Sequence, residues 1–253
     1  MGALNGLGLK TLIQREVGRF ANVWVQTVAA PVVTTALFYA VFALALGGGG
    51  RGPEFLAFLA PGLVMMVMAQ NAFANATSSL IIAKMQGNIV DILIAPLSPA
   101  ELCAGYVVGA VARGLAVGLA ASCALSLFAP VGLHSLGTVL LFAVLGTTMM
   151  GALGLLAGLW AEKFDHMAAI TNFIVTPLTF LSGTFYELHR LPPFWQDLAL
   201  WNPFFYMIDG FRAGFTGTPE GALAFGAAYL AAICVGLLLA AWALIRSGYK
   251  IKP

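Results

Sequence analysis

Polar side chains recur at helical spacing inside two of the most apolar segments of the chain. Asn71, Asn75, Ser78 and Ser79 are separated by four, three and one residues, so a helix carries them on one face. Amides and hydroxyls are expensive to bury unpaired in hydrocarbon, so this face contacts either protein or a water-filled path. Two alternatives fit: the lining of a path, and hydrogen bonding between packed helices. A second stripe consists of Asn172, Thr176, Thr179 and Gly183.

Arg113 is a further polar candidate, because it follows Glu101 by about 12 residues, or about 18 Å along a helix. Its guanidinium either lies within the membrane and faces a cavity, or belongs to a helix that begins later and reaches back to the membrane surface. Both settings stay open at this point. The candidates for lining a path are Asn71, Asn75, Ser78, Arg113, Asn172, Thr176 and Thr179.

No motif for catalysis or metal binding occurs in the chain. The run GGGG at 47–50 lacks the Lys-Ser/Thr of a phosphate loop, and neither HExxH nor GxSxG is present. Cys103, Cys123 and Cys234 have no spacing typical of metal ligands. We therefore expect no catalytic residues, no metal and no cofactor in this chain. No Asp or Glu lies in the middle of an apolar run, which argues against proton-driven transport.

The composition indicates that lipid is the solvent for these apolar segments. Of 253 residues, 60% are hydrophobic and 9% are charged, whereas soluble domains carry about 25% charged residues. A soluble fold of this size could not cover so much apolar surface. The net charge of +2 without a basic cluster argues against a nucleic-acid partner.

Gaps between charged residues mark the membrane spans. About 31 uncharged residues separate Arg19 from Arg51, and about 48 separate Arg113 from Glu162, where about 20 residues suffice for one crossing. We predict an all-α membrane protein with a single transmembrane domain over 1–253. Its six spans are expected near 24–46, 55–83, 104–129, 136–160, 167–186 and 221–245.

The distribution of Lys and Arg predicts that both termini are cytoplasmic. In that orientation the cytoplasmic side carries the larger share of these residues, as the positive-inside rule requires. The inner set is Lys10, Arg15, Arg19, Lys84, Lys163, Arg246, Lys250 and Lys252, against Arg51, Arg190 and Arg212 outside.

The segment LKTLIQREVGRF at 9–20 is amphipathic when read as a helix. We expect an interfacial helix on the inner membrane surface, with an ordinary cytoplasmic helix as the alternative. Its apolar face consists of Leu9, Leu12, Ile13, Val17 and Phe20.

The connection KMQGNIVDILIAPLSPAELCAGY, 84–106, contains a short amphipathic segment that ends at Pro96. Ile89, Ile92 and Leu93 fall on one face of a helix here. Such a helix is either a docking site for a soluble partner or a connector that lies on the membrane surface.

The most distinctive segment is FLSGTFYELHRLPPFWQDLALWNPFFYMIDGFRAGFTG, which begins at Phe180 and is rich in proline, aromatic residues and charge. Together with the 84–106 connection, it resembles the type-2 ABC transporter permease family. The closest resemblance is to the bacterial branch of multidrug and polysaccharide or polyol-phosphate export permeases. The resemblance covers essentially the whole chain and does not name a substrate.

The resemblance implies a homodimer in the bacterial inner membrane, with two copies of a separate ATPase that carries ATP and Mg²⁺. It implies that the 84–96 segment couples to this ATPase, through Gly87, Asn88, Ile89, Asp91, Ile92 and Leu93. It also implies a re-entrant external hairpin before the last span. That hairpin includes Leu191, Pro192, Asn202, Pro203, Tyr206, Asp209 and Arg212.

The function expected on these grounds is that of the transmembrane subunit of an ATP-driven exporter for an amphipathic drug-like, lipid or glycan substrate. A dedicated polysaccharide or glycolipid exporter and a non-transporting scaffold or biogenesis factor are the alternatives. Asp209 and Arg212 are three residues apart, so we also expect them to pair on a helix at the outer membrane edge. The charges of Glu187, His189 and Arg190 have no assigned role.

Overall fold

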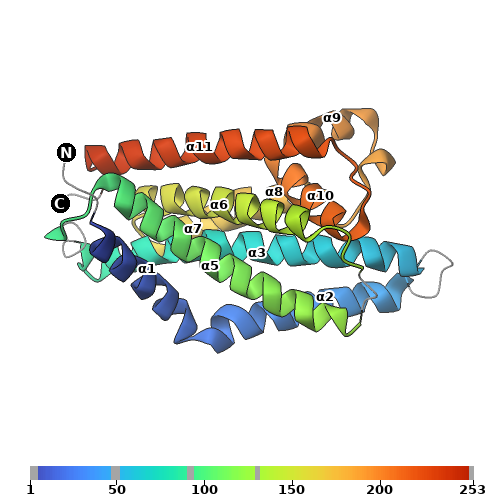
Figure 1. Ribbon diagram of the computed structural model, residues 1–253, viewed down its shortest axis with the longest axis horizontal. Helices are drawn as coiled ribbons and strands as arrows, with labels where there is room; N and C mark the ends of the chain where they lie inside the picture. Colours follow the sequence, from blue (N-terminus) through green and yellow to red (C-terminus); the bar gives the residue numbers. More distant parts are fainter. Residues whose placement is uncertain (1–4, 47–51, 90–93, 129–131, 251–253) are drawn as a thin grey trace.

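The structure is a computed structural model that describes residues 5–46, 52–89, 94–128 and 132–250. Every regular element in these ranges is helical (Figure 1). In chain order the elements are α1 (Gly6–Ala21), the π-helical turn η1 (Val25–Ala29), α2 (Ala30–Leu46), α3 (Gly52–Met85), α5 (Pro99–Ser126), α6 (Leu136–Trp160), α7 (Phe164–Ile170), the π-helical turn η2 (Thr171–Val175), α8 (Thr176–Phe180), the 3₁₀ turn η3 (Leu188–Arg190), α9 (Pro193–Trp201), α10 (Pro203–Thr216) and α11 (Leu223–Ser247).

Five helices in the described ranges are long and apolar enough to cross a membrane. They correspond to five of the expected spans, with ends that differ by a few residues. They are Val25–Ala45, Glu54–Met85, Pro99–Ser126, Leu136–Trp160 and Leu223–Ser247. An all-helical, multi-pass protein is therefore confirmed.

The remaining expected span, 167–186, is broken into α7, η2 and α8. Pro177 stands in the first turn of α8 and cannot donate a backbone hydrogen bond to the preceding turn. The π-helical turn η2 shifts the bonding pattern immediately before it. A sixth crossing along this broken helix stays a prediction.

The third span is expected to begin near residue 104, and the helix that contains it begins earlier, at Pro99. Helix α5 begins at Pro99, because Ser98 and Glu101 form a reciprocal cap that closes its first turn. The Ser98 hydroxyl accepts the Glu101 amide at 3.3 Å, and the Glu101 carboxylate accepts the amides of Ser98 at 2.7 Å and Asn5 at 2.5 Å. The same carboxylate therefore joins the start of α1 to the start of α5.

Helix α3 is the centre of the bundle. In its most apolar window 67% of the residues are buried, against 11% for the span that contains α2 and 22% for α11. Helix α6 packs closely along it, since a Cβ at Gly154 would lie 2.4 Å from the Phe73 carbonyl oxygen. Glycine is thus required where the α6 backbone meets α3.

The start of α1 and the end of α11 lie at one end of the bundle, together with the end of α3 and the start of α5 (Figure 1). The short helix α9 and the turn that precedes it lie at the opposite end. The segments expected to couple to an ATPase and to form an external hairpin therefore occupy opposite ends of the molecule.

We expect Gly154→Ala to destabilise the fold by about 1–3 kcal/mol, because the new methyl group collides with backbone that cannot move aside. Gly137→Ala in the same helix is the matched control, since nothing lies within 4 Å of its Cβ position. Thermal unfolding of both variants in detergent measures the difference. Equal melting temperatures for the two variants would show that the α3–α6 contact is looser than described.

Candidate functional site

A groove of about 330 Å³ lies between the segment Gln26–Phe38 and helix α3. It is unusual for a membrane-facing surface because amides and hydroxyls line it alongside apolar side chains. Asn71, which the sequence predicts as a path-lining residue, is one of them. The polar lining residues are Gln26, Thr34, Thr35, Gln70 and Asn71, and Phe185 lies at the edge.

Arg113 contacts the back of this groove. Its Nη2 donates to Asn71 Oδ1 at 2.9 Å, and Asn71 Nδ2 donates to the Val67 carbonyl at 3.0 Å. The guanidinium is half-buried and its Nε has no hydrogen-bond partner among the described residues. The contact of Arg113 is therefore an amide on α3, and its depth in the membrane stays a prediction.

Beyond Asn71, towards the end of α3, a charged cluster joins α1 to that helix. Arg19 Nη2 donates to the Asn75 carbonyl at 2.8 Å and to its Oδ1 at 2.9 Å, and Arg19 Nη1 donates to Ser78 Oγ at 3.2 Å. Glu16 is fully buried and accepts a hydrogen bond from Ser79 Oγ at 2.8 Å. These contacts support interhelical hydrogen bonding for Asn75 and Ser79, whereas Asn71 faces the groove.

Sequence reasoning missed Glu16. The amphipathic pattern of 9–20 identified only the apolar residues of one face. In the structure the face of α1 that is buried against α5 and α3 consists of Leu12, Glu16 and Phe20, at four-residue spacing. That spacing was the available signal, because Glu16 lies on the same face as the two buried apolar residues.

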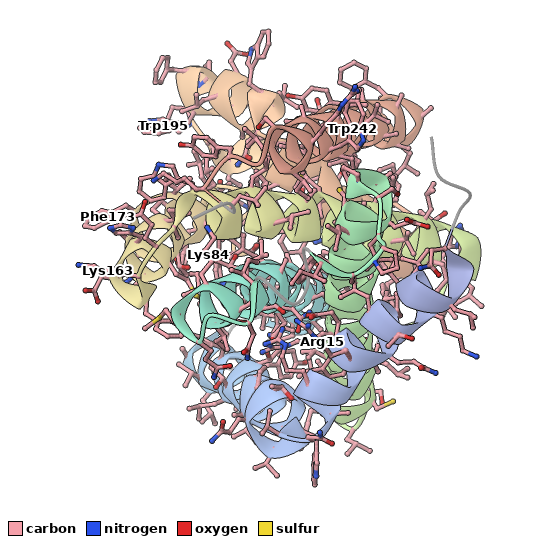
Figure 2. The ribbon with its side chains drawn as sticks, turned by 90° about the vertical axis from the view of Figure 1, so that its left-hand side faces the viewer. Arg15, Lys84, Lys163, Phe173, Trp195 and Trp242 are labelled. Carbon is pink, nitrogen blue, oxygen red and sulfur yellow. The ribbon has the colours of Figure 1, made fainter. Side chains whose placement is uncertain are left out.

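The second polar stripe does not meet the first within one chain. Asn172 is exposed, Thr176 is half-buried, and Thr179 is buried with its hydroxyl bonded to the Val175 carbonyl at 2.6 Å. Phe173 beside them points away from the bundle (Figure 2). The broken helix α7–α8 therefore presents a mixed face to the surroundings.

At the opposite end, Arg212 joins three segments. Its Nε donates to the Phe58 carbonyl at 3.1 Å and its Nη2 to the Gly183 carbonyl at 2.6 Å, while its guanidinium carbon lies 3.5 Å from the centre of the Phe58 ring. Its ion-pair partner is Glu220, at 3.6 Å. Helix α3, the turn at Gly183 and the linker before α11 are thus held together by one buried side chain.

The predicted ion pair between Asp209 and Arg212 is wrong, because each of these residues binds other groups. Asp209 accepts the backbone amides of Glu220 and Gly221, each at 2.9 Å. Both side chains reach the linker before α11, where Asp209 binds backbone amides and Arg212 pairs with the Glu220 carboxylate. Burial raises the pKa of Glu220, which also accepts the amide of Leu188 at 2.5 Å.

The remaining residues of the expected hairpin divide into buried and exposed sets. Asn202 caps α10 by accepting the Phe204 amide at 3.0 Å and also donates to the Leu178 carbonyl at 3.1 Å. Pro203 opens α10, and Tyr206 is buried. Leu191 is half-buried and Pro192 is exposed.

The charges at 187–190 interact with one another. Arg190 Nε lies 2.6 Å from the Glu187 carboxylate, and His189 Nε2 lies 3.3 Å from it. The His and Arg side chains are more than half exposed, so the pairs contribute little to stability.

The coupling segment is described only in part. Gly87 has a φ of +76°, which ends the turn after α3, and Ile89 packs against the core while Ile94 is exposed. Asn88 lies in this turn and is exposed. The predicted coupling residues Asp91, Ile92 and Leu93 lie outside the described residues.

Lys84, at the start of this segment, binds the end of α6. Its Nζ donates to the carbonyls of Gly158, Leu159 and Ala161 at 2.9, 2.6 and 3.1 Å, which are groups that a helix terminus leaves unpaired. Lys250 adds a bond to the Trp160 carbonyl at 3.2 Å. The end of α3 and the end of α6 are therefore tied together beside the coupling segment (Figure 2).

We expect Arg19→Gln to destabilise the protein by about 2 kcal/mol, because it removes charge-assisted bonds to Asn75 and leaves Glu16 with a weaker partner. Arg15→Gln is the control, since Arg15 also faces Glu16, at 3.5 Å, but is half exposed. Thermal unfolding in detergent distinguishes them. If the two variants melt together, the cluster does not anchor α1.

Comparison with known proteins shows which family the chain resembles. The family model described as ABC-2 type transporter matches residues 8–216. The chain is 41% identical over 249 residues to the inner membrane transport permease YadH of Escherichia coli (strain K12), which covers 97% of each chain. It is 24% identical over 237 residues to nodulation protein J of Rhizobium leguminosarum bv. viciae, covering 88% of this chain and 89% of that protein.

A shorter match, 36% identical over 66 residues, joins the chain to the capsule polysaccharide export inner-membrane protein BexB of Haemophilus influenzae and covers 26% of this chain and 25% of that protein. The family model, by contrast, covers most of the chain, including the groove, the α1 cluster and the Arg212 contacts. The chain therefore belongs to the ABC-2 type transporter family, as a membrane permease with several spanning helices.

Proposed function

We propose that the chain is the transmembrane subunit of an ATP-driven exporter in the bacterial inner membrane, with its path along the groove between α2 and α3. The observation that carries this proposal is the placement of Asn71 in that groove with Arg113 bonded behind it. Polar residues inside an apolar span are commonly retained for a function, and Asn71 lines the groove while its amide is held by Arg113. Passage of an amphipathic molecule supplies such a function.

The energy comes from a separate ATPase, present in two copies, which carries ATP and Mg²⁺. Permeases of this family normally work with such a subunit. The 84–96 segment is the proposed contact. Lys84 supports this, because it ties the start of that segment to the end of α6, close to where α7 begins.

The proposed topology has six crossings, with α7, η2 and α8 as the fifth. Both termini are cytoplasmic, which fits the location of the start of α1 and the end of α11 at one end of the bundle together with Lys84 and Lys163 (Figures 1 and 2). Helices α9 and α10 form the re-entrant external hairpin. Its support is that α10 is buried against the spans although proline residues interrupt the chain on either side of α9.

The working form is a homodimer in which a second copy covers the groove. Helix α2 is largely exposed along its length, and its outward residues Val33, Leu37 and Val41 are apolar. Thr34 on the same helix lines the groove. A second copy that packs on this face would enclose the polar lining and exclude lipid from it.

The substrate class is an amphipathic drug-like molecule, a lipid or a glycan. A dedicated glycan exporter is the alternative within transport. The name of the capsule polysaccharide relative favours this alternative, although that match covers only about a quarter of the chain. A non-transporting scaffold is the alternative of another class. An ATPase that purifies with this chain, and whose activity the chain stimulates, separates an exporter from a scaffold.

We expect Ile92→Asp with Leu93→Asp to abolish association with the ATPase and to leave membrane insertion intact, because two carboxylates cannot be buried in an apolar contact. The matched control is Leu133→Asp with Leu136→Asp, two exposed leucines near the opposite end of the bundle. Co-purification from membranes measures association. An undiminished yield of ATPase with the first pair contradicts coupling through this segment.

A cysteine in place of Asn71 should react with a small water-soluble thiol reagent in a background without Cys103, Cys123 and Cys234, because the groove admits water. A cysteine at Asn75 should react only in a nucleotide-trapped state, since that side chain is fully buried at rest. Thr77→Cys is the control, because Thr77 is buried between α3 and α6. Protection of Asn71→Cys in both states would mean that the groove is packed and not open.

A further inference from the structure

A second groove, of about 680 Å³, runs between α5, α6 and α11, and its character differs from that of the first. Its lining is almost wholly hydrocarbon, with Thr148 as its one hydroxyl. On α5 it extends from Ala100 to Val111, which is about 16 Å of helix. That length is about half of the 30 Å hydrocarbon core, the depth of one leaflet.

The groove offers nothing that would bind a polar ligand along its length. A sugar or a peptide would leave its hydroxyls or amides unpaired against the valines and leucines, at a cost of several kcal/mol for each group. A hydrocarbon chain would bury its surface at no such cost. The other residues that line the groove on α6 and α11 include Val144, Val235, Leu238 and Leu239.

One end of the groove carries an aromatic ring and a cation. Trp242 lines the groove on the last turns of α11, and the guanidinium carbon of Arg246 lies 5.1 Å from the centre of its ring. Figure 2, which looks onto the end of the bundle where α1 starts and α11 ends, labels Trp242 at this position on α11. Arg246 is exposed, in the last turn of the helix.

Trp and Arg at this depth are the residues that bind a lipid at the level of its headgroup. Indole rings favour the membrane interface, and a guanidinium makes paired hydrogen bonds to a phosphate. The nearest carboxylate on α5, Glu101, does not compete for Arg246, because Ser98 and Asn5 bind it. Among the described residues Arg246 forms no ion pair, so we assign its guanidinium to a ligand.

We propose that this groove is a binding site for an anionic phospholipid, with one acyl chain between α5 and α11 and the phosphate at Arg246. The bound chain fills the space beside α11, which is the least buried span after the one that contains α2. It thereby holds the last helix against the bundle. This site is separate from the transport path and requires neither an ATPase nor a substrate.

The test is lipid binding by the purified full chain. Delipidated protein in detergent is titrated with phosphatidylglycerol, phosphatidylcholine or inorganic phosphate, and its melting temperature and retained lipid phosphorus are measured. We expect phosphatidylglycerol to raise the melting temperature and to remain bound after washing. Phosphatidylcholine should bind about tenfold more weakly, and inorganic phosphate should have no effect.

Two variants examine the two ends of the ligand. Ala104→Phe projects a ring into the groove and should lower the retained phosphatidylglycerol about tenfold, while Ala240→Phe, on the exposed face of α11 and outside the groove, should not. Arg246→Gln should reduce binding of phosphatidylglycerol to the level of phosphatidylcholine. Lys163→Gln, an exposed cation elsewhere at the same end, is its control.

Several results would overturn the proposal. Equal lipid retention by Ala104→Phe and Ala240→Phe would place the lipid outside the groove. Equal binding of the two lipids by the unmodified chain would exclude a preference for an anionic headgroup, and unchanged binding of phosphatidylglycerol by Arg246→Gln would exclude a role for Arg246. A stabilising effect of inorganic phosphate alone would make the site one for a free anion. Should Ala104→Phe fail to fold, Arg246→Gln still decides the matter, because that side chain lies on the surface.

Discussion

The absence of water around the spans is the constraint on which the rest of this structure depends. Polar side chains that enter the bundle are therefore stabilised by bonds to other protein groups. Glu16 and Arg19 illustrate the result, since the carboxylate binds Ser79 and the guanidinium binds Asn75. The position of α1 is therefore determined by hydrogen bonds to α3 as much as by its apolar face.

The same constraint explains the hydrogen bonds that link helices at both ends of the bundle. At one end Lys84 binds the last carbonyls of α6, and at the other Arg212 binds the Phe58 carbonyl of α3 and the Gly183 carbonyl of the turn after α8. Each is a single cation that joins segments far apart in the sequence. Lys84 thus links the end of α3 to the end of α6 beside the segment proposed to couple to the ATPase.

The two grooves of the bundle differ in the polarity of their lining. The groove beside α2 carries amides and a bonded arginine, so it suits a polar or amphipathic molecule. The groove beside α11 is nearly all hydrocarbon and ends in a cation at the mouth. The two grooves involve different helices, since the first lies beside α2 and α3 and the second beside α5, α6 and α11.

The amino-acid sequence by itself determined that the chain is a helical membrane protein, where most of its spans lie, and which family it resembles. These follow from charge gaps, periodicity and one distinctive segment, all of which are local properties. Only the tertiary structure decided the partners of the charges. The amphipathic pattern of 9–20 did not reveal that Glu16 is buried. Arg212 binds α3 and Glu220 instead of Asp209. Such contacts join helices that are far apart in the sequence. The spacing of residues along one helix does not show which other helix it packs against.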